Sequence, residues 1–245
     1  MIDYISQIDT QRFGFQIARI NDAATLTSSG FIRSLKEQGI VLVIARIDSE
    51  NLPAINALED AGFRIKDIQC TWRHTTGEPV NDQYLNSDII IRPAVTADIP
   101  SVTSIAHHAF DHYGHYFADQ RLDTDQCREI YPEWAASSIT DKKTADQSFV
   151  AVHNENIAGF LALKILEKDG EKYSAGVLGA VSEDSRGQNI FASLVIAALR
   201  WGQATVPTWQ EHNSLAVNYA VNRVFTKIGF RQSGSSVTMH CWLDR

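Results

Sequence analysis

The chain has 245 residues, of which 44% are hydrophobic and 21% charged, with a net charge of −7. This composition is that of a soluble globular protein, and it excludes disorder, collagen-like repeats and coiled coil. No cluster of Lys and Arg marks a surface for nucleic acid, although an acidic total does not forbid a local pocket for a phosphate-bearing ligand. At about 150 residues per domain, the length corresponds to roughly one and a half folding units.

Membrane, secretion and metal signals are absent from the sequence. The longest apolar stretches, such as Gly39–Ala45 and Leu194–Leu199, fall far short of the roughly 20 residues that span a bilayer. Met1–Thr10 has no Lys or Arg, unlike a secretory signal. Three widely spaced cysteines form no metal-ligand pair and no disulfide framework: Cys70, Cys127 and Cys241. We therefore expect a cytoplasmic protein without a membrane, a bound metal or nucleic acid as partner.

The N-terminal part contains a strand–helix–strand pattern that recurs later in the chain. Its strands are expected at Ile40–Arg46 and Ile68–His74, and the segment Asn51–Arg64 between them resembles Asn218–Arg231. Each segment opens with Asn, carries a second Asn, and ends in Gly-Phe-Arg; the first Asn and the Gly-Phe-Arg lie at a constant offset of 167 positions. Gly-Phe after a helix is common by itself, because Gly ends helices. The wider agreement predicts that residues 1–74 are a truncated copy of a later domain.

A polar segment, His74 to Asp88, separates the two apolar-patterned regions. Its Gly77, Pro79 and Asn81 are turn-forming residues, so that residues 75–87 are predicted to be a linker. The main domain is then residues 88–245.

This main domain is predicted to be α/β (α+β), with a mixed central sheet flanked by helices on both faces. We expect, in chain order, strand Ile89–Arg92, a helix from Thr96 to Phe110, an aromatic loop Phe110–Thr124, a helix from about Asp123, strands Ser148–Val152, Ile157–Lys164 and Tyr173–Val181, helix Ile190–Trp201, strand Val206–His212, helix Asn218–Lys227 and strand Val237–Leu243.

The segment Val181–Leu194 is the most informative for function. A strand ends, a polar loop crosses, and an apolar helix begins at about Asn189. The first N–H groups of a helix have no partner within it, and with the helix dipole they favour an anion such as a pyrophosphate. Arg186 adds a positive charge and Gly187 permits close approach of the backbone. The alternative is an ordinary crossover with a surface Arg.

Ile89 to Arg245 resembles the GNAT acyltransferase superfamily, whose acetyl-CoA motif is R/Q-x-x-G-x-G/A after a strand. Arg186 takes the first position, whereas Asn189 and Phe191 replace the two small residues. The resemblance implies acyl-CoA as co-substrate, with no metal, and a set of residues that bind it: Ala180, Val181, Arg186, Gly187, Gln188, Asn189, Ile190, Phe191, Asn218 and Phe225.

The usual general acid of this family is a Tyr seven residues after the Asn at position 218. Here that residue is Phe225, which has no proton to donate. Tyr219, His212 and Asn222 are candidate substitutes, and water also suffices, because the thiol of CoA is acidic. For each candidate the alternative is a polar residue at the surface or the edge of the core.

The whole chain further resembles the dTDP-amino-sugar N-acyltransferases, in which a half-domain precedes a GNAT domain with an aromatic insert. The matching residues are Ala109-Phe110, the loop tyrosines and Tyr131-x-x-Trp134. The resemblance implies binding of a nucleobase and sugar by five side chains: Tyr113, His115, Tyr116, Tyr131 and Trp134. Alternatively, Tyr131 and Trp134, at helical spacing, belong to the core.

The implied activity is direct attack of a sugar amine on the acyl-CoA thioester, for surface polysaccharide synthesis. The acyl group is acetyl or a short hydroxyacyl such as 3-hydroxybutanoyl, and the amine is at position 3 or 4 of a dideoxyhexose. Two alternatives stay open: a protein or peptide N-acetyltransferase of the same fold, and a non-catalytic acyl-CoA sensor. A homodimer through a free sheet edge is a further expectation.

Overall fold

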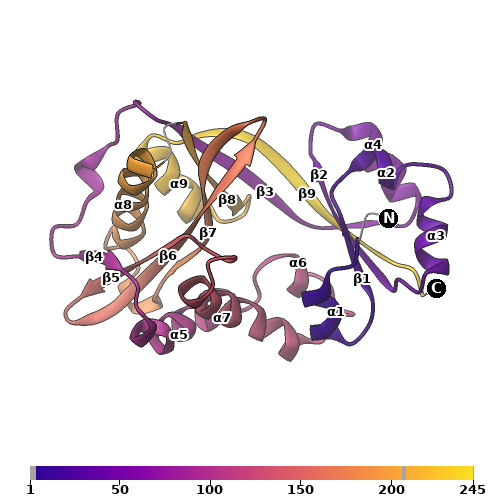
Figure 1. The fold of residues 1–245 in the computed structure, drawn as a ribbon, viewed down its shortest axis with the longest axis horizontal. Coiled ribbons are helices and arrows are strands. Elements are labelled where there is room, and N and C mark those ends of the chain that lie inside the picture. The colour runs from indigo at the N-terminus through magenta and orange to yellow at the C-terminus, as the bar shows by residue number, and fades with distance from the viewer. Residues whose placement is uncertain (1–3, 206–207, 245) are drawn as a thin grey trace. The chain divides into compact units, whose positions relative to one another are not determined.

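The computed structural model describes residues 4–205 and 208–244 and divides into two compact units. Unit 1 takes its residues from three stretches of chain: those up to Cys70, His112–Cys127, and those from Gly234 onward. Unit 2 consists of Thr71–Asp111 and Arg128–Ser233. The two units therefore interleave along the chain, and each is described separately below. Their helices and strands are labelled in Figure 1.

Unit 1 is built on the strand order β1-β2-β9-β3. β1 runs parallel to β2, with Ile17 opposite Leu42, and β2 runs antiparallel to β9, with Leu42 opposite Trp242. Its elements are α1 (Gln7–Phe13), β1 (Ile17–Ile20), α2 (Ala23–Leu26), α3 (Phe31–Glu37), β2 (Leu42–Asp48), α4 (Leu52–Asp60), the first part of β3 (Arg64–Thr75), α6 (Gly114–Phe117) and the last part of β9 (Arg231–Trp242).

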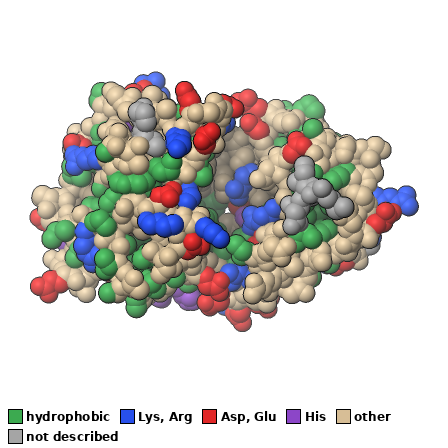
Figure 2. Space-filling model, viewed as in Figure 1, with side chains coloured by type: hydrophobic (Ala, Val, Ile, Leu, Met, Phe, Trp, Pro, Cys, Tyr) green, Lys and Arg blue, Asp and Glu red, His purple; other side chains and the backbone are tan. Residues whose placement is uncertain are grey.

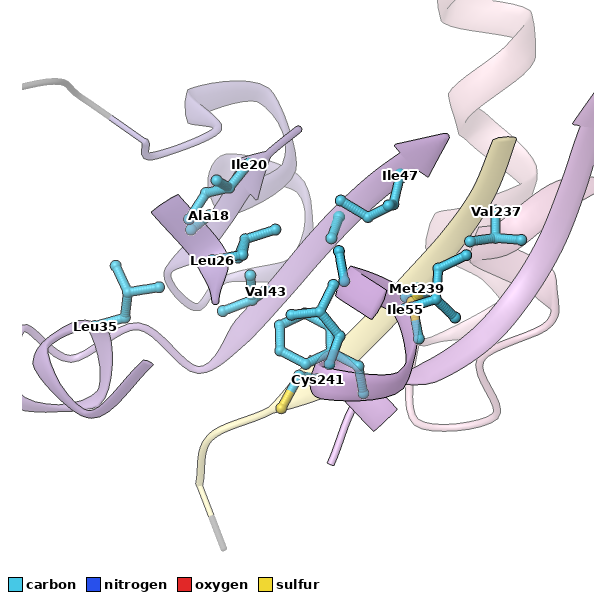
Figure 3. Packing of buried hydrophobic residues seen from close by; sticks show 14 of the residues in the cluster. Ala18, Ile20, Leu26, Leu35, Val43, Ile47, Ile55, Val237, Met239 and Cys241 are labelled. Atoms are coloured by element: carbon cyan, nitrogen blue, oxygen red, sulfur yellow. The ribbon is translucent and has the colours of Figure 1, made fainter. Parts of the chain in front are cut away.

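The core of unit 1 lies on one face of these strands, against α2, α3 and α4 (Figure 3). Alternate residues of β2 point into it, namely Val43, Ala45 and Ile47, and Met239 enters it from β9. Every one of these four side chains is at most 2% exposed. Full burial of an aliphatic side chain contributes roughly 1.5–3 kcal/mol, so the period-two pattern fixes which face of β2 is covered.

Unit 2 has the strand order β3-β8-β7-β6-β5-β4, in which β7 and β8 are parallel and β4 to β7 antiparallel. Its elements are β4 (Ile90–Pro93), α5 (Ile99–Ala109), most of α7 (Thr124–Thr140), β5 (Gln147–His153), β6 (Asn156–Lys168), β7 (Glu171–Val181), α8 (Ile190–Thr205), β8 (Trp209–Leu215) and α9 (Tyr219–Ile228), with short 3-10 turns at Asp82–Tyr84, Thr96–Asp98 and Glu183–Ser185.

Helices cover both faces of the sheet in unit 2. Residues 158–163 of β6 are buried without alternation, which is the pattern of a strand with both faces packed. Both α5 and α8 contact β6 and β7 (Figure 1). The predicted class, an α/β fold with a mixed sheet flanked by helices, is confirmed.

Several predicted boundaries are wrong. β9 begins at Arg231 rather than Val237, and β3 at Arg64 rather than Ile68, because polar residues without alternation form the first turns of both strands. Four residues of the predicted aromatic loop form the short helix α6. β8 begins at Trp209, and the predicted start of that strand, Val206 with Pro207, lies outside the described residues.

The segment predicted to be a linker is held against unit 2 by specific hydrogen bonds. Asn81 donates through Nδ2 to the carbonyl of Lys227 at the end of α9 (3.2 Å), and Asp82 pairs with Arg200 of α8 (2.8 Å). Asn86 contacts the loop that precedes α8, as described below. In this chain, therefore, the segment braces two helices of unit 2.

The strand–helix–strand pattern occurs in both units with the same geometry. β2 and β8 begin and end 167 residues apart, and so do β3 and β9. The N–H of Leu243 donates to the carbonyl of Val41 in unit 1 (2.8 Å), and the N–H of Thr76 to that of Thr208 in unit 2 (2.9 Å), again 167 positions apart. The sequence repeat thus coincides with a repeated hydrogen-bond pattern.

Candidate functional site

The parallel strands β7 and β8 share a short stretch of pairing in unit 2. Their described register consists of Ser174 opposite Gln210 and Ala175 opposite Glu211. On its other side β7 pairs with β6 as far as Val181, opposite Gly159. Beyond Ala175, every second residue of β7 directs its N–H and C=O toward the side of β8, where the described pairing supplies no partner. This is where backbone groups can bind an extended ligand.

A β-bulge lies at the point where β7 leaves β8. Leu163 of β6 is opposite Gly176, whereas the next residue, Ala162, is opposite Leu178, so Val177 is the extra residue of β7. A bulge bends the strand and increases its local twist. The bulge therefore accounts for the short pairing with β8.

The loop after β7 leads directly to the start of α8. Glu183–Ser185 form a 3-10 turn, and the N–H of Arg186 donates to the carbonyl of Glu183 (3.2 Å). α8 begins at Ile190, and the N–H of Ser193 donates to the carbonyl of Asn189 (2.9 Å). The N–H groups of the first turn have no acceptor within the helix. They form an end that suits a phosphate group.

Backbone conformation explains why Asn stands where the GNAT motif has its first small residue. Asn189 has φ 56°, in the left-handed region, and Gly187 has φ 80°. Gly adopts this region without cost, and among other residues Asn does so most readily. Asn189 therefore keeps the turn that the motif requires, and its N–H group is retained.

Phe191, at the second small position of the motif, packs toward α9. Its ring meets that of Phe225 edge to face, with centroids 5.9 Å apart. The half-buried Phe191 ring is thus part of the packing between α8 and α9.

Asn86 braces this loop from the segment before β4. Its Nδ2 donates to the carbonyl of Gln188 (3.0 Å), and its backbone N–H donates to Ser193 Oγ (3.1 Å). A bound anion would meet a loop already held in one conformation, which lowers the entropic cost of binding.

Arg186 lies at the surface of the loop. Its side chain is 56% exposed and is 3.7 Å from the carboxylate of Glu183. An exposed pair of this kind contributes little to stability, so the guanidinium can exchange Glu183 for a phosphate at little cost.

Asn218 forms the N-cap of α9. Its Oδ1 accepts from the N–H of Val221 (3.3 Å), while its neighbours Val217 and Tyr219 are 69% and 64% exposed. The exposed phenol of Tyr219 projects from the first turn of α9, and the structure assigns it no place beside Phe225.

Phe225, at the position of the family's Tyr, is 1% exposed. It lies in an aromatic cluster of unit 2, in which its ring centroid is 5.1–5.9 Å from those of four other residues: Trp72, Phe191, His212 and Phe230.

His212 is stacked on Phe225 and is buried, with 3% exposure. Burial lowers its pKa from 6.5 to about 3. The imidazole is therefore neutral at pH 7 and is not an imidazolium acid.

Asn222 is fully engaged in hydrogen bonds within unit 2. Its Oδ1 accepts from Ser214 Oγ (2.5 Å) and Trp72 Nε1 (3.2 Å), and its Nδ2 donates to the carbonyls of Leu215 and Ala216 (both 3.2 Å). This arrangement fixes the end of β8 to α9, and it is a structural role.

The predicted substrate residues are divided between the two units. In unit 2, Tyr131 stacks on Phe110 with centroids 4.5 Å apart and an angle of 21°, and Trp134 stacks beyond it at 6.3 Å and 23°. Tyr131 is 8% exposed and Trp134 is 38% exposed. The stack thus has a buried end and an open end, and Trp134 forms the open one.

Tyr113, His115 and Tyr116 belong to unit 1. Tyr113 is half-buried and precedes α6, whereas His115 and Tyr116 are 5% and 6% exposed. The Tyr116 hydroxyl donates to Asp9 Oδ1 (2.6 Å), which also pairs with Arg19, and burial raises the pKa of Tyr116.

His115 belongs to a buried hydrogen-bonded chain in unit 1. Its Nδ1 is 2.9 Å from His240 Nε2, and His240 Nδ1 is 2.7 Å from Asp119 Oδ2. Burial lowers the pKa of both histidines, and the charge of His240 lowers that of His115 further. Burial alone would raise the pKa of Asp119, but hydrogen bonds from His240 and Trp242 outweigh it and hold that pKa well below its usual range.

Two polar residues of the site were not predicted. Ser174 of β7 and Gln210 of β8 are 0% and 3% exposed, and the Ser174 hydroxyl donates to Gln210 Oε1 (3.0 Å). The signal in the sequence was the alternation Gln210, His212, Ser214 along one strand face, where apolar residues are the rule.

Two structural searches gave negative results within the described part of the chain. Between residues 4 and 205 and from 208 to 244, no helix is long and apolar enough to cross a membrane. In the same ranges, no three His, Cys, Asp or Glu side chains form a group that could hold a metal ion. On the face shown in Figure 2, acidic and basic side chains are both widely spread.

The Acetyltransferase (GNAT) family matches residues 106–230, about half of the chain. No curated protein matches the sequence.

Solved structures show the same fold. They include a GCN5-related N-acetyltransferase from Sphaerobacter thermophilus (16% identity, TM-score 0.57, 82% of this chain), a functionally unknown conserved protein from Staphylococcus epidermidis (14%, 0.61, 98% of this chain and 92% of that one) and a tandem GNAT protein from the clavulanic acid biosynthesis pathway (12%, 0.62, 94% and 76%). The chain spans 60% of the length of the Sphaerobacter protein.

Proposed function

Because the chain belongs to the GNAT acetyltransferase family, we propose that it transfers an acyl group from acyl-CoA to the amine of a dTDP-linked amino-dideoxy sugar. Members of the family use acetyl-CoA as co-substrate. The observation that carries acyl-CoA binding is the braced turn at Asn189 before α8, beside strands β7 and β8 that part after two residue pairs.

The residues of unit 2 fit acyl-CoA, and each has a chemical task. The N–H groups at the start of α8 and the Arg186 guanidinium would hold the pyrophosphate. Unpaired backbone groups near Ala180 and Val181 would hold the pantetheine arm and the thioester carbonyl. The amine attacks the carbonyl carbon directly, so no Ser or Cys nucleophile is needed. The CoA thiolate leaves with the electron pair of the C–S bond, and the proton of the amine passes to water.

The amino-sugar acceptor is supported by the aromatic insert. The Phe110–Tyr131–Trp134 stack ends in a partly exposed indole, which is a surface on which a flat pyrimidine can stack. An amine on a sugar ring is less basic than a lysine side chain, so water or a weak base can accept its proton near neutral pH. Synthesis of a surface polysaccharide is the corresponding biological role.

The N-terminal part is proposed to be a truncated GNAT-like copy that kept the strand–helix–strand pattern and lost the pyrophosphate loop. It is supported by the repeat of 167 residues in strand bounds and hydrogen bonds. The tandem GNAT protein of similar fold agrees with this view.

The test is release of free thiol from acetyl-CoA and from 3-hydroxybutanoyl-CoA with dTDP-3-amino and dTDP-4-amino dideoxyhexoses. We expect turnover with at least one pair, and competitive inhibition by dTDP. Turnover on peptide amines that dTDP does not inhibit would instead identify a protein N-acetyltransferase. Binding of acyl-CoA in calorimetry without turnover on any amine would identify a sensor, the function that the buried Phe225 would suit.

A further inference from the structure

His212 lies where the pairing of β7 and β8 ends. The last described pair is Ala175 opposite Glu211, and the next residues along the two strands are Gly176 and His212. A Cβ on Gly176 would overlap the His212 ring, with Nδ1 as its nearest atom. The imidazole therefore occupies the space of the missing side chain, directly at the bulged part of β7.

A chain of buried hydrogen bonds determines which ring nitrogen carries the proton. Gln210 Oε1 accepts from the Ser174 hydroxyl (3.0 Å), so the amide directs its NH₂ group to His212 Nε2 (2.8 Å). An NH₂ group can only donate, and Nε2 must therefore accept. The neutral imidazole then carries its proton on Nδ1, the atom that faces Gly176.

The repeated scaffold shows that this polar chain is not needed for folding. The residues 167 positions before Gln210 and His212 are Val43 and Ala45, which lie in the apolar core of unit 1. Buried polar groups are costly unless they are hydrogen-bonded. The chain thus occurs in the copy that carries the acyl-CoA loop, where the other copy has aliphatic side chains.

We propose that His212 is a neutral hydrogen-bond donor to the reacting thioester, and that Gln210 and Ser174 are positioning residues that hold its tautomer. The proposal rests on the proposed function. The amine nitrogen forms the new C–N bond, the carbonyl π electrons move to oxygen and return, and the C–S bond breaks with its electron pair on sulfur. His212 Nδ1–H stabilises the charge that develops during these steps and keeps its proton, while water protonates the thiolate and accepts the proton of the amine.

A hydrogen-bond donor, rather than a general acid, is what this environment supports. Loss of a proton from a neutral imidazole would leave an imidazolate, which is far too basic to form. The side chains that contact the ring, Gln210, Phe225 and Phe230, carry no titratable group. The rate is therefore expected to show no titration of His212 between pH 6 and 9.

The first test is ¹⁵N NMR of the histidine-labelled protein. We expect His212 to be neutral with its proton on Nδ1, and its Nδ1 resonance to move on addition of acetyl-CoA and less with CoA alone. A proton on Nε2, or a Nδ1 resonance that acetyl-CoA leaves in place although calorimetry shows that it binds, would overturn the proposal. If acetyl-CoA does not bind at all, it is the proposed function that fails, whereas the tautomer is still measured.

The second test compares two identical substitutions. His74 is also buried in unit 2 and packs edge-on against Phe230 at 5.4 Å, as His212 does. We expect H212F to lower kcat about 10- to 100-fold with the Kd of acyl-CoA within threefold, and H74F to leave kcat within threefold. Equal kcat values for the two variants would overturn the proposal.

A third variant acts on the tautomer without removing the ring. In Q210E the carboxylate accepts from Nε2–H and draws the proton away from Nδ1. We expect a loss of kcat similar to that of H212F, together with the reversed tautomer in the NMR spectrum. A reversed tautomer with unchanged kcat would exclude the donor role even if H212F fails to fold.

Discussion

Asn218 begins α9 in the same way as Asn51 begins α4. The two backbones have φ −83° with ψ 67° and 60°, and each Oδ1 accepts from the N–H three residues on, at 3.3 and 3.2 Å. One cap stands beside the proposed pantetheine site of unit 2, and the other stands in unit 1. The pair separates a capping role from a binding role.

We expect N51A and N218A to lower the free energy of unfolding by about the same amount, roughly 1 kcal/mol. Only N218A should also raise the KM for acyl-CoA, because only Asn218 has been placed near the pantetheine arm. Urea denaturation and acyl-CoA titrations measure the two effects. Equal KM values for the two variants would remove Asn218 from the binding site.

Substitution of Asn189 tests the left-handed turn before α8. N189G should bind CoA as well as the natural protein, because Gly adopts φ 56° without strain. N189A should bind more weakly, since a left-handed Ala costs about 1–2 kcal/mol. Isothermal calorimetry with CoA provides the measurement. If N189A binds as tightly as N189G, the turn has no part in holding the pyrophosphate.

Removal of Arg186 should weaken CoA binding without affecting folding. We expect R186A to raise the Kd about tenfold, an effect that shrinks at high salt, and to change the free energy of unfolding by less than about 0.5 kcal/mol. Arg200 is the matched control, because it is equally exposed (55%) and pairs with Asp82 on the same helix, α8. A similar Kd for R186A and R200A would show that Arg186 does not contact the phosphates.

Buried neutral histidines should make the protein less stable in weak acid. The pKa values of His115, His240 and His212 are all lowered in the folded state. Below pH 6.5 the unfolded chain binds protons that the folded chain does not, so the free energy of unfolding falls as the pH falls. The contribution of His212, with a folded pKa of about 3, amounts to about 2 kcal/mol between pH 6.5 and 5.

Urea denaturation at pH 7 and pH 5 measures this loss. H212F should lose about 2 kcal/mol less between the two pH values than the natural protein does. Asp119, whose pKa is lowered, adds a further loss only below about pH 4, outside this window. An equal pH dependence for H212F and the natural protein would contradict the burial argument.

Restoring the family's Tyr at position 225 should not restore an acid. Phe225 is 1% exposed among aromatic rings, and an added hydroxyl without a partner there costs about 1–3 kcal/mol. We expect F225Y to be less stable in thermal unfolding and to have a kcat no higher than that of the natural protein. A clear rise in kcat would mean that the hydroxyl reaches the leaving sulfur.

Local patterns predicted the fold of unit 2 well. The helix beginning at Ile190 and the hairpin of β5 and β6 follow directly from apolar periodicity. The extended first parts of β3 and β9 were missed, because their residues are polar and neighbouring strands hold them extended. No residue type signals the bulge at Val177, which comes from the register of β6 against β7.

The candidate site was predicted in its loop and less so in its chemistry. The Arg186–Phe191 loop follows from a motif, and a motif is local in sequence. His212 was singled out as a substitute acid, but its protonation depends on Gln210 and Ser174, which only pairing of β7 and β8 brings together. Predicting its neutral state requires burial, a tertiary property.

The interleaving of the two units has a consequence for synthesis of the chain on the ribosome. Unit 1 contains the first 70 residues and also those from Gly234 onward, and β2 pairs with β9 from Ser236 to Trp242. The part made first therefore waits for the part made last, with most of its sheet partner still untranslated. A gene fragment that starts at residue 88 would likewise leave the end of β9 without β2, so that neither unit can be produced as one uninterrupted piece.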